Sequence, residues 1–374
     1  MKIGIYTIHN AYNYGAMLQA FATQKALSKR GYTSEFVNVY TDEQEDINEV
    51  KIFSFKIKSF LTYLYARLNP KVQLKFKLFR EFHKLMNVSK RYHTMDEIYE
   101  NPPKYDVHLV GSDQVWNLEK GFEKKAYFFL DFLSSKELKM SYASSFGTAS
   151  ISENCSARLR GLLVGFSAIS TREKDGVAIV KKHTGMEATQ VLDPTFLLNA
   201  NEWDVVAKEP SIKGEYILCY GFDGSEKSKE MIESAKKRLN LPIVLVTVSL
   251  FFPLKVDVFL HEVGPAEFLG LVKNATFICT SSYHGMALAI NYRKSFIGTL
   301  HPNRNSRMHS MLSIFGLEHR QLDTPKDILE MLDEELYIEY STIEHKIEKA
   351  ILDSGNWLDS SLKNRVSNFE NSVI

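Results

Sequence analysis

Short apolar runs alternate with helical segments along most of the chain, and each run ends in a polar or glycine-containing turn. Residues 2–7 predict a buried strand, 9–14 a turn, and the stretch that begins at Gly15 a helix with one apolar face. Gly31 ends that helix, and 33–39 predicts the next strand. A strand, a helix and a second strand in this order form a βαβ unit, which restricts the chain to folds with a parallel sheet covered by helices.

The first half of the chain directs several turns toward one sheet edge. Further strands are predicted at 107–110, 139–143 and 168–170, and they run into the turns GSDQVWN, SSFG and TREKDG. The carboxyl ends of parallel strands lie at the same edge of a sheet, so we expect these turns to meet where ligands bind in such folds. The run QVLDP at 190–194 closes this half, because proline interrupts strand pairing.

The second half repeats the alternation. Its predicted strands are 216–220, 242–248 and 276–279, separated by helices at about 225–239 and at 264–274. A helix of small residues follows His284, and the tail after Pro325 is largely helical.

The sequence therefore predicts an α/β protein with two Rossmann-like domains. We expect an N-terminal domain at 1–197 with a helical insert at about 51–92, a C-terminal domain at 198–330, and helices at 331–374 that pack back on the first domain.

Composition restricts the partners of the chain. The 374 residues are 44% hydrophobic and contain 46 Lys and Arg against 45 Asp and Glu, so no global positive field favours nucleic acid. The three cysteines lack a CxxC spacing, the N-terminus lacks the apolar core of a signal peptide, and no apolar run reaches the roughly 18 residues of a membrane span. These features predict a cytoplasmic protein without a nucleic-acid partner.

Residues 51–91 interrupt the alternation as a basic amphipathic hairpin. Eleven Lys and Arg side chains accompany two helical repeats of apolar residues, against a single acid, Glu81. Such a segment suits contact with the anionic inner face of the cell membrane or with a lipid-linked molecule. It equally suits an inserted helical pair whose apolar face covers the sheet and whose lysines are solvated, and both interpretations stay open here.

The turn TSSYHG at 280–285 has the features of an anion site. Ser281 and Ser282 offer hydroxyls, and the helix that begins near Gly285 offers free backbone N–H groups and a positive dipole end. His284 lies in the middle of this turn as a titratable group. Serine before a helix is also an ordinary cap, so a structural role is the alternative.

Other candidate residues are predicted at strand ends of the first half, facing this turn. They are Asn13, Tyr14, Gly15, Ser112, Asp113, Gln114 and Arg172. The guanidinium of Arg172 could bind a carboxylate or phosphate through two parallel hydrogen bonds, or form an ion pair within the protein. Arg304 and Arg307 could add positive charge from the second half, or remain solvated.

Other chemistries have weaker support. No pair of histidines stands at i and i+4, and no carboxylate cluster has the spacing of a cation loop, so no metal site or cofactor is predicted. Walker-type and GxGxxG loops are absent, and Ser281, Ser282 and His284 lack the nucleophile elbow and orienting acid of a hydrolase triad.

Six stretches in the same order resemble the polysaccharide pyruvyl transferase family. They are AYNYGAMLQAFATQKAL, DVHLVGSDQVWN, SYASSFG, ISTREKDG, VLDPTFLL and TSSYHGMALAINYRKSFI, and the resemblance runs from residue 1 to about residue 320. It implies a GT-B-like arrangement of the two domains. It also implies transfer of the pyruvyl group of phosphoenolpyruvate onto two hydroxyls of one sugar, which forms a cyclic ketal and releases phosphate.

The resemblance assigns roles to two of the candidate residues. His284 matches the family histidine and is expected to be the general acid, and Arg172 matches an arginine expected to bind the donor. The others are assigned by their predicted positions: Ser281, Ser282, Gly285, Arg304 and Arg307 to the donor, and Asn13, Tyr14, Gly15, Ser112 and Gln114 to the acceptor. Asp113 lies where other branches of the family have a glycine triplet, and it is expected to act as base, to bind the acceptor sugar or to cap a helix. One departure stands out, because some members have an arginine where this chain has Ser282.

The implied acceptor is a saccharide precursor of a surface polysaccharide, such as an exopolysaccharide or a capsule, either free or lipid-linked. Two alternatives remain. The run GPAEFLGLVKNATFICTSS has the shape seen in GT-B glycosyltransferases, which would use a nucleotide sugar as donor. A sugar-binding or scaffold protein that contacts the membrane through 51–91 is the third reading.

Overall fold

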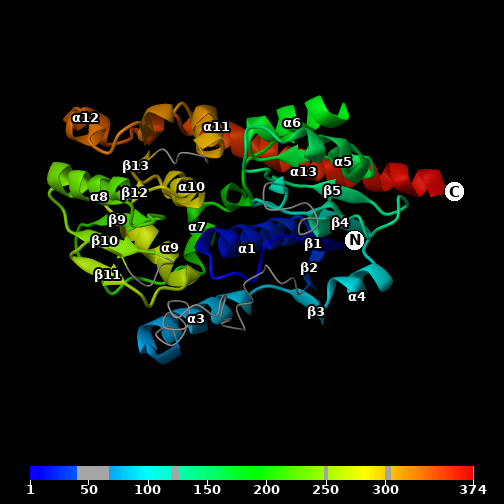
Figure 1. Cartoon of the computed structure of the whole chain (residues 1–374), viewed down its shortest axis with the longest axis horizontal. Coiled ribbons are helices and arrows are strands. Elements are labelled where there is room, and N and C mark those ends of the chain that lie inside the picture. Colours follow the sequence, from blue (N-terminus) through cyan, green and yellow to red (C-terminus); the bar gives the residue numbers. More distant parts are fainter. Residues whose placement is uncertain (40–66, 119–125, 248–251, 300–304, 374) are drawn as a thin grey trace.

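Two six-stranded parallel sheets form the framework of the protein (Figure 1). The computed structural model describes residues 1–39, 67–118, 126–247, 252–299 and 305–373. The first sheet has the strand order β3-β2-β1-β4-β5-β6 and the second β11-β10-β9-β12-β13-β14. Both orders reverse direction beside the first strand of the sheet, so each sheet has a switch point between its central strands. This confirms the predicted pair of Rossmann-like sheets.

The first sheet arises from the apolar runs predicted in the first half. Its strands are β1 Lys2–Tyr6, β2 Thr33–Val39, β3 Val88–Tyr92, β4 Val107–Val110, β5 Lys139–Ser141 and β6 Phe166–Ala168, with a short pair, β7 Ser170–Thr171 and β8 Thr189–Gln190, beside them. The connecting helices are α1 Tyr14–Lys29, α3 Pro70–His83, α4 Met95–Glu100, α5 Glu153–Leu163 and α6 Lys174–Thr184.

The second sheet follows the alternation predicted in the second half. Its strands are β9 Ile217–Tyr220, β10 Ile243–Val246, β11 Val258–Leu260, β12 Phe277–Thr280, β13 Phe296–Thr299 and β14 Gln321–Leu322. Its principal helices are α8 Glu226–Leu239, α9 Pro265–Asn274, α10 Tyr283–Asn291 and α11 Asn305–Phe315. Ser225 caps α8 by accepting a hydrogen bond from the backbone N–H of Ser228, as its position before the helix indicates.

The C-terminal helix α13, Glu344–Val373, begins beside α11 and continues along the first domain (Figure 1). Arg30 in the loop after α1 forms an ion pair with Asp359 at 2.7 Å. The hydroxyl of Ser354 accepts a hydrogen bond from the backbone N–H of Leu192 at 2.9 Å. The last helix of the chain therefore returns to the half in which the chain began.

The expected insert at 51–92 differs from a helical hairpin. Residues 51–66 lie outside the described residues, and α3 provides the second predicted helix. Residues 88–92, however, form strand β3 and extend the first sheet at its edge. The run VSKRY carries two basic residues, Lys90 and Arg91, and basic side chains are common on edge strands because they hinder pairing with other chains.

Helix α3 also connects the two domains. The ammonium group of Lys75, expected to be solvated, is buried and donates to the backbone oxygen of Thr247 at 3.1 Å. Lys71 forms an ion pair with Glu262 at 3.0 Å, and the side chain of Leu78 lies against Gly264. The lysines on this side of the helix therefore hold the second domain.

The segment between the two sheets is buried. The 3-10 helix η3, Pro194–Leu197, packs against both α1 and α10. The side-chain amide of Asn291, at the end of α10, donates to the backbone oxygens of Thr195 and Leu198 at 2.9 and 2.8 Å. One hydrophobic cluster contains core residues of both halves, from Ile3 to Leu362. The two domains thus share a core.

Within the described ranges, the helices are either too short or too polar to traverse a lipid bilayer.

A substitution at Gly270 tests how closely α9 packs against the segment that leads into the second domain. A Cβ at this position would lie 1.7 Å from the backbone oxygen of Lys208. Backbone atoms cannot move aside as a side-chain tip can, so we expect Gly270→Ala to lower the free energy of unfolding by about 1–3 kcal/mol. Guanidinium denaturation at pH 7 measures the loss.

Gly161, in the exposed part of α5, provides the control. A Cβ there would meet no atom within 4 Å. Gly161→Ala should therefore raise stability by about 0.5–1 kcal/mol, the usual gain when alanine replaces glycine inside a helix. Equal effects of the two substitutions would contradict the packing described here.

Candidate active site

The strand ends of the first domain form a short additional layer. Beyond the ends of β4 and β5, Asp113 pairs with Ser144. Ser144 also pairs with Thr171, the last residue of β7. The backbone N–H of Val191 donates to the oxygen of Thr171 at 2.9 Å, which adds the chain before Asp193. Four turns that are distant in sequence are thus held side by side at the carboxyl edge of the sheet, as predicted for three of them.

Arg172 lies at the centre of this layer, and its side chain is fully buried. Its Nη1 donates to Asp193 Oδ2 at 3.0 Å, and its Nη2 donates to Asp113 Oδ1 at 3.3 Å. The ring of Tyr283 lies 4.4 Å from the guanidinium carbon, in a cation–π contact. The charge of Arg172 is therefore compensated within the protein.

His284 reaches this cluster from the second domain. Its Nε2 lies 3.5 Å from Arg172 Nη1 and 3.6 Å from Asp193 Oδ2. The opposite edge of the ring packs against α1, where a Cβ on Gly15 would lie 2.1 Å from Nδ1. The structure thus brings His284 and Arg172 into contact, and only glycine at position 15 leaves room for the imidazole.

The local sequence fixes the first turn of α10. Ser282 caps the helix, with its hydroxyl accepting from the N–H of Gly285 at 3.4 Å. Gly285 packs against Thr280, since a Cβ would lie 2.3 Å from the Thr280 hydroxyl. The Ser281 hydroxyl donates to the backbone oxygen of Gly221, at the end of β9. The turn therefore lies at the switch point of the second sheet, between β9 and β12.

The carboxylates around Arg172 differ in their electrostatics. Burial raises the pKa of Asp193, but His284, Arg172 and the Ser112 hydroxyl outweigh burial and hold that pKa well below its ordinary value. Asp113 follows the same pattern. Burial raises its pKa, but Arg172, His284 and a backbone N–H lower that pKa by more, so the net shift is downward. Burial dominates for Glu173, whose pKa is raised. Asp193 and Asp113 thus stay ionised.

Asp113 has an unusual backbone. Its φ of 74° lies in the left-handed region of the backbone, which residues other than glycine rarely adopt. Its carboxylate accepts from the N–H of Gln114 at 2.8 Å as well as from Arg172. About 16% of its side chain remains exposed, whereas that of Arg172 is fully covered. Strain of this kind is common where a side chain must face a ligand.

Of the two arginines predicted to serve the site from the second half, Arg304 and Arg307, the structure describes one. Arg304 lies outside the described residues. Arg307 is almost buried, and its two terminal nitrogens lie 2.7 and 2.9 Å from the side-chain amide of Gln114, which accepts with its oxygen turned toward them. This contact again joins the second domain to a strand end of the first.

The three remaining candidates have contacts within the protein. Asn13 caps α1 by accepting from Ala16 N–H at 3.1 Å. Tyr14 is buried between the domains, and its hydroxyl donates to the backbone oxygen of Val263 at 2.9 Å. The hydroxyl of Ser112, also buried, donates to Asp193 Oδ2 at 2.7 Å. Tyr14 and Ser112 are thus placed to support the site from inside rather than to touch a sugar.

Sequence reasoning missed Asp193 and Tyr283, which both contact Arg172. Asp193 precedes a proline at the end of a strand in VLDPTFLL, a stretch noted as an interruption of pairing and as one of the six family-like stretches, with no role given to its acid. An acid at a strand end of the same sheet edge as Asp113 was the available signal. For Tyr283 there was none, since a tyrosine in a helix turn usually belongs to the core.

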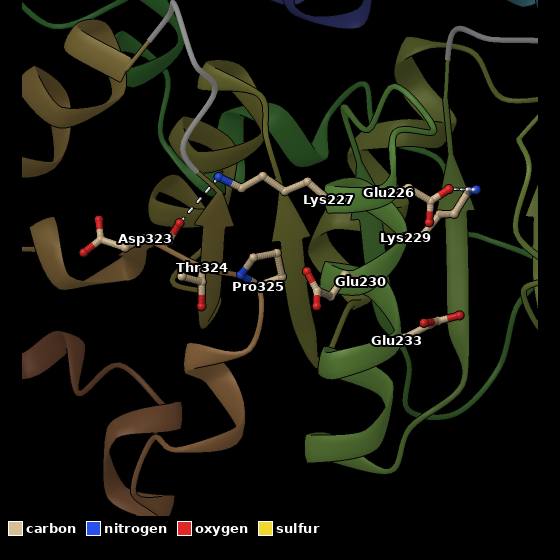
Figure 2. A pocket seen from close by; sticks show the side chains of 8 residues that line it. All are labelled: Glu226, Lys227, Lys229, Glu230, Glu233, Asp323, Thr324 and Pro325. Atoms are coloured by element: carbon tan, nitrogen blue, oxygen red, sulfur yellow. Dashed lines mark hydrogen bonds and ion pairs between the residues drawn. The ribbon is translucent and has the colours of Figure 1, made fainter.

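A surface hollow lies elsewhere, between α8 and the residues after β14. Figure 2 shows the residues that line it, which include Glu226, Glu230, Glu233 and Asp323. Lys227 donates to the backbone oxygen of Asp323 at 3.4 Å, and Lys229 pairs with Glu226. None of the predicted site residues lines this hollow, and its lining carries more acidic than basic side chains.

Among the described residues, no three His, Cys, Asp or Glu side chains are arranged so that they could hold a metal ion.

Comparison with known families decides the assignment. The family model described as polysaccharide pyruvyl transferase matches residues 13–301, which is most of the chain. The chain belongs to the polysaccharide pyruvyl transferase family. It is therefore a transferase. A search of curated proteins found no match.

Solved structures have a similar fold. The S. aureus MnaA–UDP co-structure matches with a TM-score of 0.51 at 12% identity, covering 92% of this chain and 90% of that one. The UDP-GlcNAc 2-epimerase from Neisseria meningitidis bound to UDP-GlcNAc has a TM-score of 0.49 at 12% identity, covering 97% and 99%. At 12% identity, the likeness to the MnaA structure shows the GT-B-like fold alone.

Arg172→Met should expose the electrostatic role of the cluster. The substitution leaves Asp193 and Asp113 buried without their cation, so we expect a loss of about 3–5 kcal/mol in unfolding free energy at pH 7. Carboxyls whose folded pKa is lowered stabilise above pH 4 or so, and this contribution is lost as pH falls. The difference between the two proteins should therefore shrink toward pH 3, as chemical denaturation at several pH values would measure.

Arg238 is the matched control, because it pairs with Asp333 at 2.6 Å on the surface. Exposed pairs contribute about 0–1 kcal/mol, so Arg238→Met should have a small effect at every pH. A large loss for Arg172→Met that does not depend on pH would assign the effect to packing instead.

Proposed function

We propose that the protein transfers the pyruvyl group of phosphoenolpyruvate to a sugar of a surface-polysaccharide precursor, such as that of an exopolysaccharide or a capsule, and forms a cyclic ketal. The observation that carries the proposal is the meeting of His284 with Arg172 and Asp113, at the opposed carboxyl edges of two sheets in a member of this family. Ligands of doubly wound domains bind at such edges.

The proposed reaction needs a proton donor and a proton acceptor. Protonation of C3 of the enol converts its methylene into a methyl group and leaves C2 electron-deficient. One sugar hydroxyl adds to C2, inorganic phosphate leaves, and a second hydroxyl of the same sugar closes the ring. The two hydroxyls release two protons, so the acceptor gains one pyruvic acid less one water.

His284 and Asp113 suit these two tasks. An imidazolium can deliver the proton to C3 or to the departing phosphate. Asp113 is ionised and partly exposed, so its free carboxylate lone pairs can orient a sugar hydroxyl and accept its proton. We assign the acceptor to the first-domain side of the site, near Asn13, Gly15 and Gln114.

The donor would lie on the second-domain side. The positive end of α10, at Ser281, Ser282 and Gly285, suits a phosphate through its dipole. The backbone N–H groups of these three residues already donate within the protein, so they add to this field rather than offer open hydrogen bonds. Arg307 supplies positive charge that Ser282 does not. Because Asp193 and Asp113 already bind and compensate Arg172, we assign to Arg172 the ordering of the donor side rather than a two-pronged contact with the donor.

A lipid-linked acceptor would bring the enzyme to the inner face of the cell membrane. The exposed side of α3 supports such contact, since Leu74 and Leu85 are 42% and 49% exposed beside Lys77 and Lys84. Lys75 takes no part, because it binds Thr247.

His284→Gln tests the general acid. Glutamine keeps the size of the side chain but cannot deliver a proton, so we expect turnover of phosphoenolpyruvate to fall by about 10² to 10⁴. Phosphate release in the presence of acceptor oligosaccharides, with mass spectrometry of the product, measures it. His309→Gln on the exposed side of α11 should leave turnover unchanged. Normal phosphate release by the His284 variant would remove this role.

A binding measurement separates pyruvyl transfer from glycosyl transfer. Calorimetry with phosphoenolpyruvate and with a panel of nucleotide sugars should show binding and thermal stabilisation by phosphoenolpyruvate only. Stabilisation by a nucleotide sugar, with transfer of its sugar to the acceptor, would make the protein a glycosyltransferase instead.

Charge reversal tests the membrane contact. Lys77→Glu together with Lys84→Glu should weaken sedimentation with vesicles of phosphatidylcholine and phosphatidylglycerol, since each basic residue near such a surface contributes about 1 kcal/mol. The same reversal at Lys181 and Lys182, exposed on α6, is the control. Equal binding by all three proteins would place the membrane surface elsewhere or nowhere.

A further inference from the structure

Asp193 has a fully occupied carboxylate. Oδ2 accepts from Ser112 Oγ at 2.7 Å and from Arg172 Nη1 at 3.0 Å, and it lies 3.6 Å from His284 Nε2. Oδ1 accepts from both the N–H and the hydroxyl of Thr195, at 3.0 and 2.8 Å. The side chain is completely buried. Such a carboxylate has one orientation, because each oxygen is held by two donors.

The chain around Asp193 holds the helix that carries His284. At the far end of α10, Asn291 donates to the oxygens of Thr195 and Leu198. At the near end, the imidazole meets Asp193 itself. Both ends of one helix are thus fixed by residues 193–198, so the position of His284 is set from the segment that joins the two domains.

Opposite charges compete for the imidazole. Arg172 Nη1 and Asp193 Oδ2 lie at nearly the same distance from Nε2, 3.5 and 3.6 Å, so their effects on an imidazolium largely cancel. Asp113 adds a second negative charge from the end of β4, and Tyr283 faces the ring edge-on from α10 itself. On the α1 side the neighbour is Gly15, which carries no charge. The balance therefore depends on the carboxylate at 193.

We propose that Asp193 is a positioning residue, which orients the imidazole of His284 and keeps it protonated against the field of Arg172. The inference rests on the pyruvyl transfer proposed above, in which the imidazolium gives its proton to the substrate. Asp193 itself touches no substrate.

Asp193→Asn tests the inference, since it keeps the shape and removes the charge. A general acid works only while protonated, so activity declines as pH rises through a basic limb. We expect that limb to move to lower pH by about one unit or more, because an opposite charge this close favours the charged form. Turnover at pH 8 should fall at least tenfold and recover in part at pH 6. A purely structural role would lower turnover by the same factor at every pH.

A direct measurement on the imidazole needs no substrate. With ¹⁵N-labelled histidine, assigned through His284→Gln, the ring-nitrogen shifts at pH 7 should show less protonated His284 in Asp193→Asn than in the parent protein. An unchanged protonated share would overturn the positioning role, even if pyruvyl transfer is found. Absence of ketal product with the parent protein would overturn the proposed function and leave the nuclear magnetic resonance result standing.

Asp193→Glu provides a second variant should the asparagine variant not fold. It keeps the charge and moves the carboxylate by one methylene group, so the basic limb should stay in place while turnover falls about tenfold from misorientation. Turnover equal to that of the parent protein would contradict the positioning role.

Discussion

The buried guanidinium of Arg172 is the contact on which the arrangement of the site depends. Removing such a charge from water costs several kcal/mol unless partners surround it, and here Asp193, Asp113 and the ring of Tyr283 do so. Arg172, Asp193 and Asp113 all follow strands of the first domain, while the ring of Tyr283 belongs to α10 of the other domain. Satisfying one cation therefore fixes the turns of the first domain and the docking of α10 at the same time.

Periodicity was sufficient to predict the framework. Strands β2 and β4 begin and end where the apolar runs do, and α8 begins after Ser225 as its capping residue indicates. These are local properties: a run of β-branched and aromatic residues or a serine before a helix acts through its immediate neighbours. The edge strand β3 was hidden because VSKRY follows an amphipathic helix and carries two of the basic residues that defined the insert.

The candidate site was predicted less completely, for a physical reason. His284, Arg172 and Asp113 could be chosen because a turn after a strand reaches a shared edge in any parallel sheet. Their partners could not, since the burial of Arg172 depends on which side chains converge from four separate turns. Lys75 illustrates the same limit: its sequence neighbours suggest a solvated face, whereas the backbone oxygen of Thr247 and the ring of Tyr14 make its burial acceptable.

The packed joint between the domains has a consequence for how such enzymes diversify. In many proteins of two halves, a flexible connector lets one half be exchanged for a relative's without rebuilding the other. Here Thr195 and Leu198 in the connector bind Asn291, and Tyr14 reaches Val263 through the shared core. Neither half is an interchangeable module, so a new acceptor specificity must arise from substitutions in the surface turns of an intact chain.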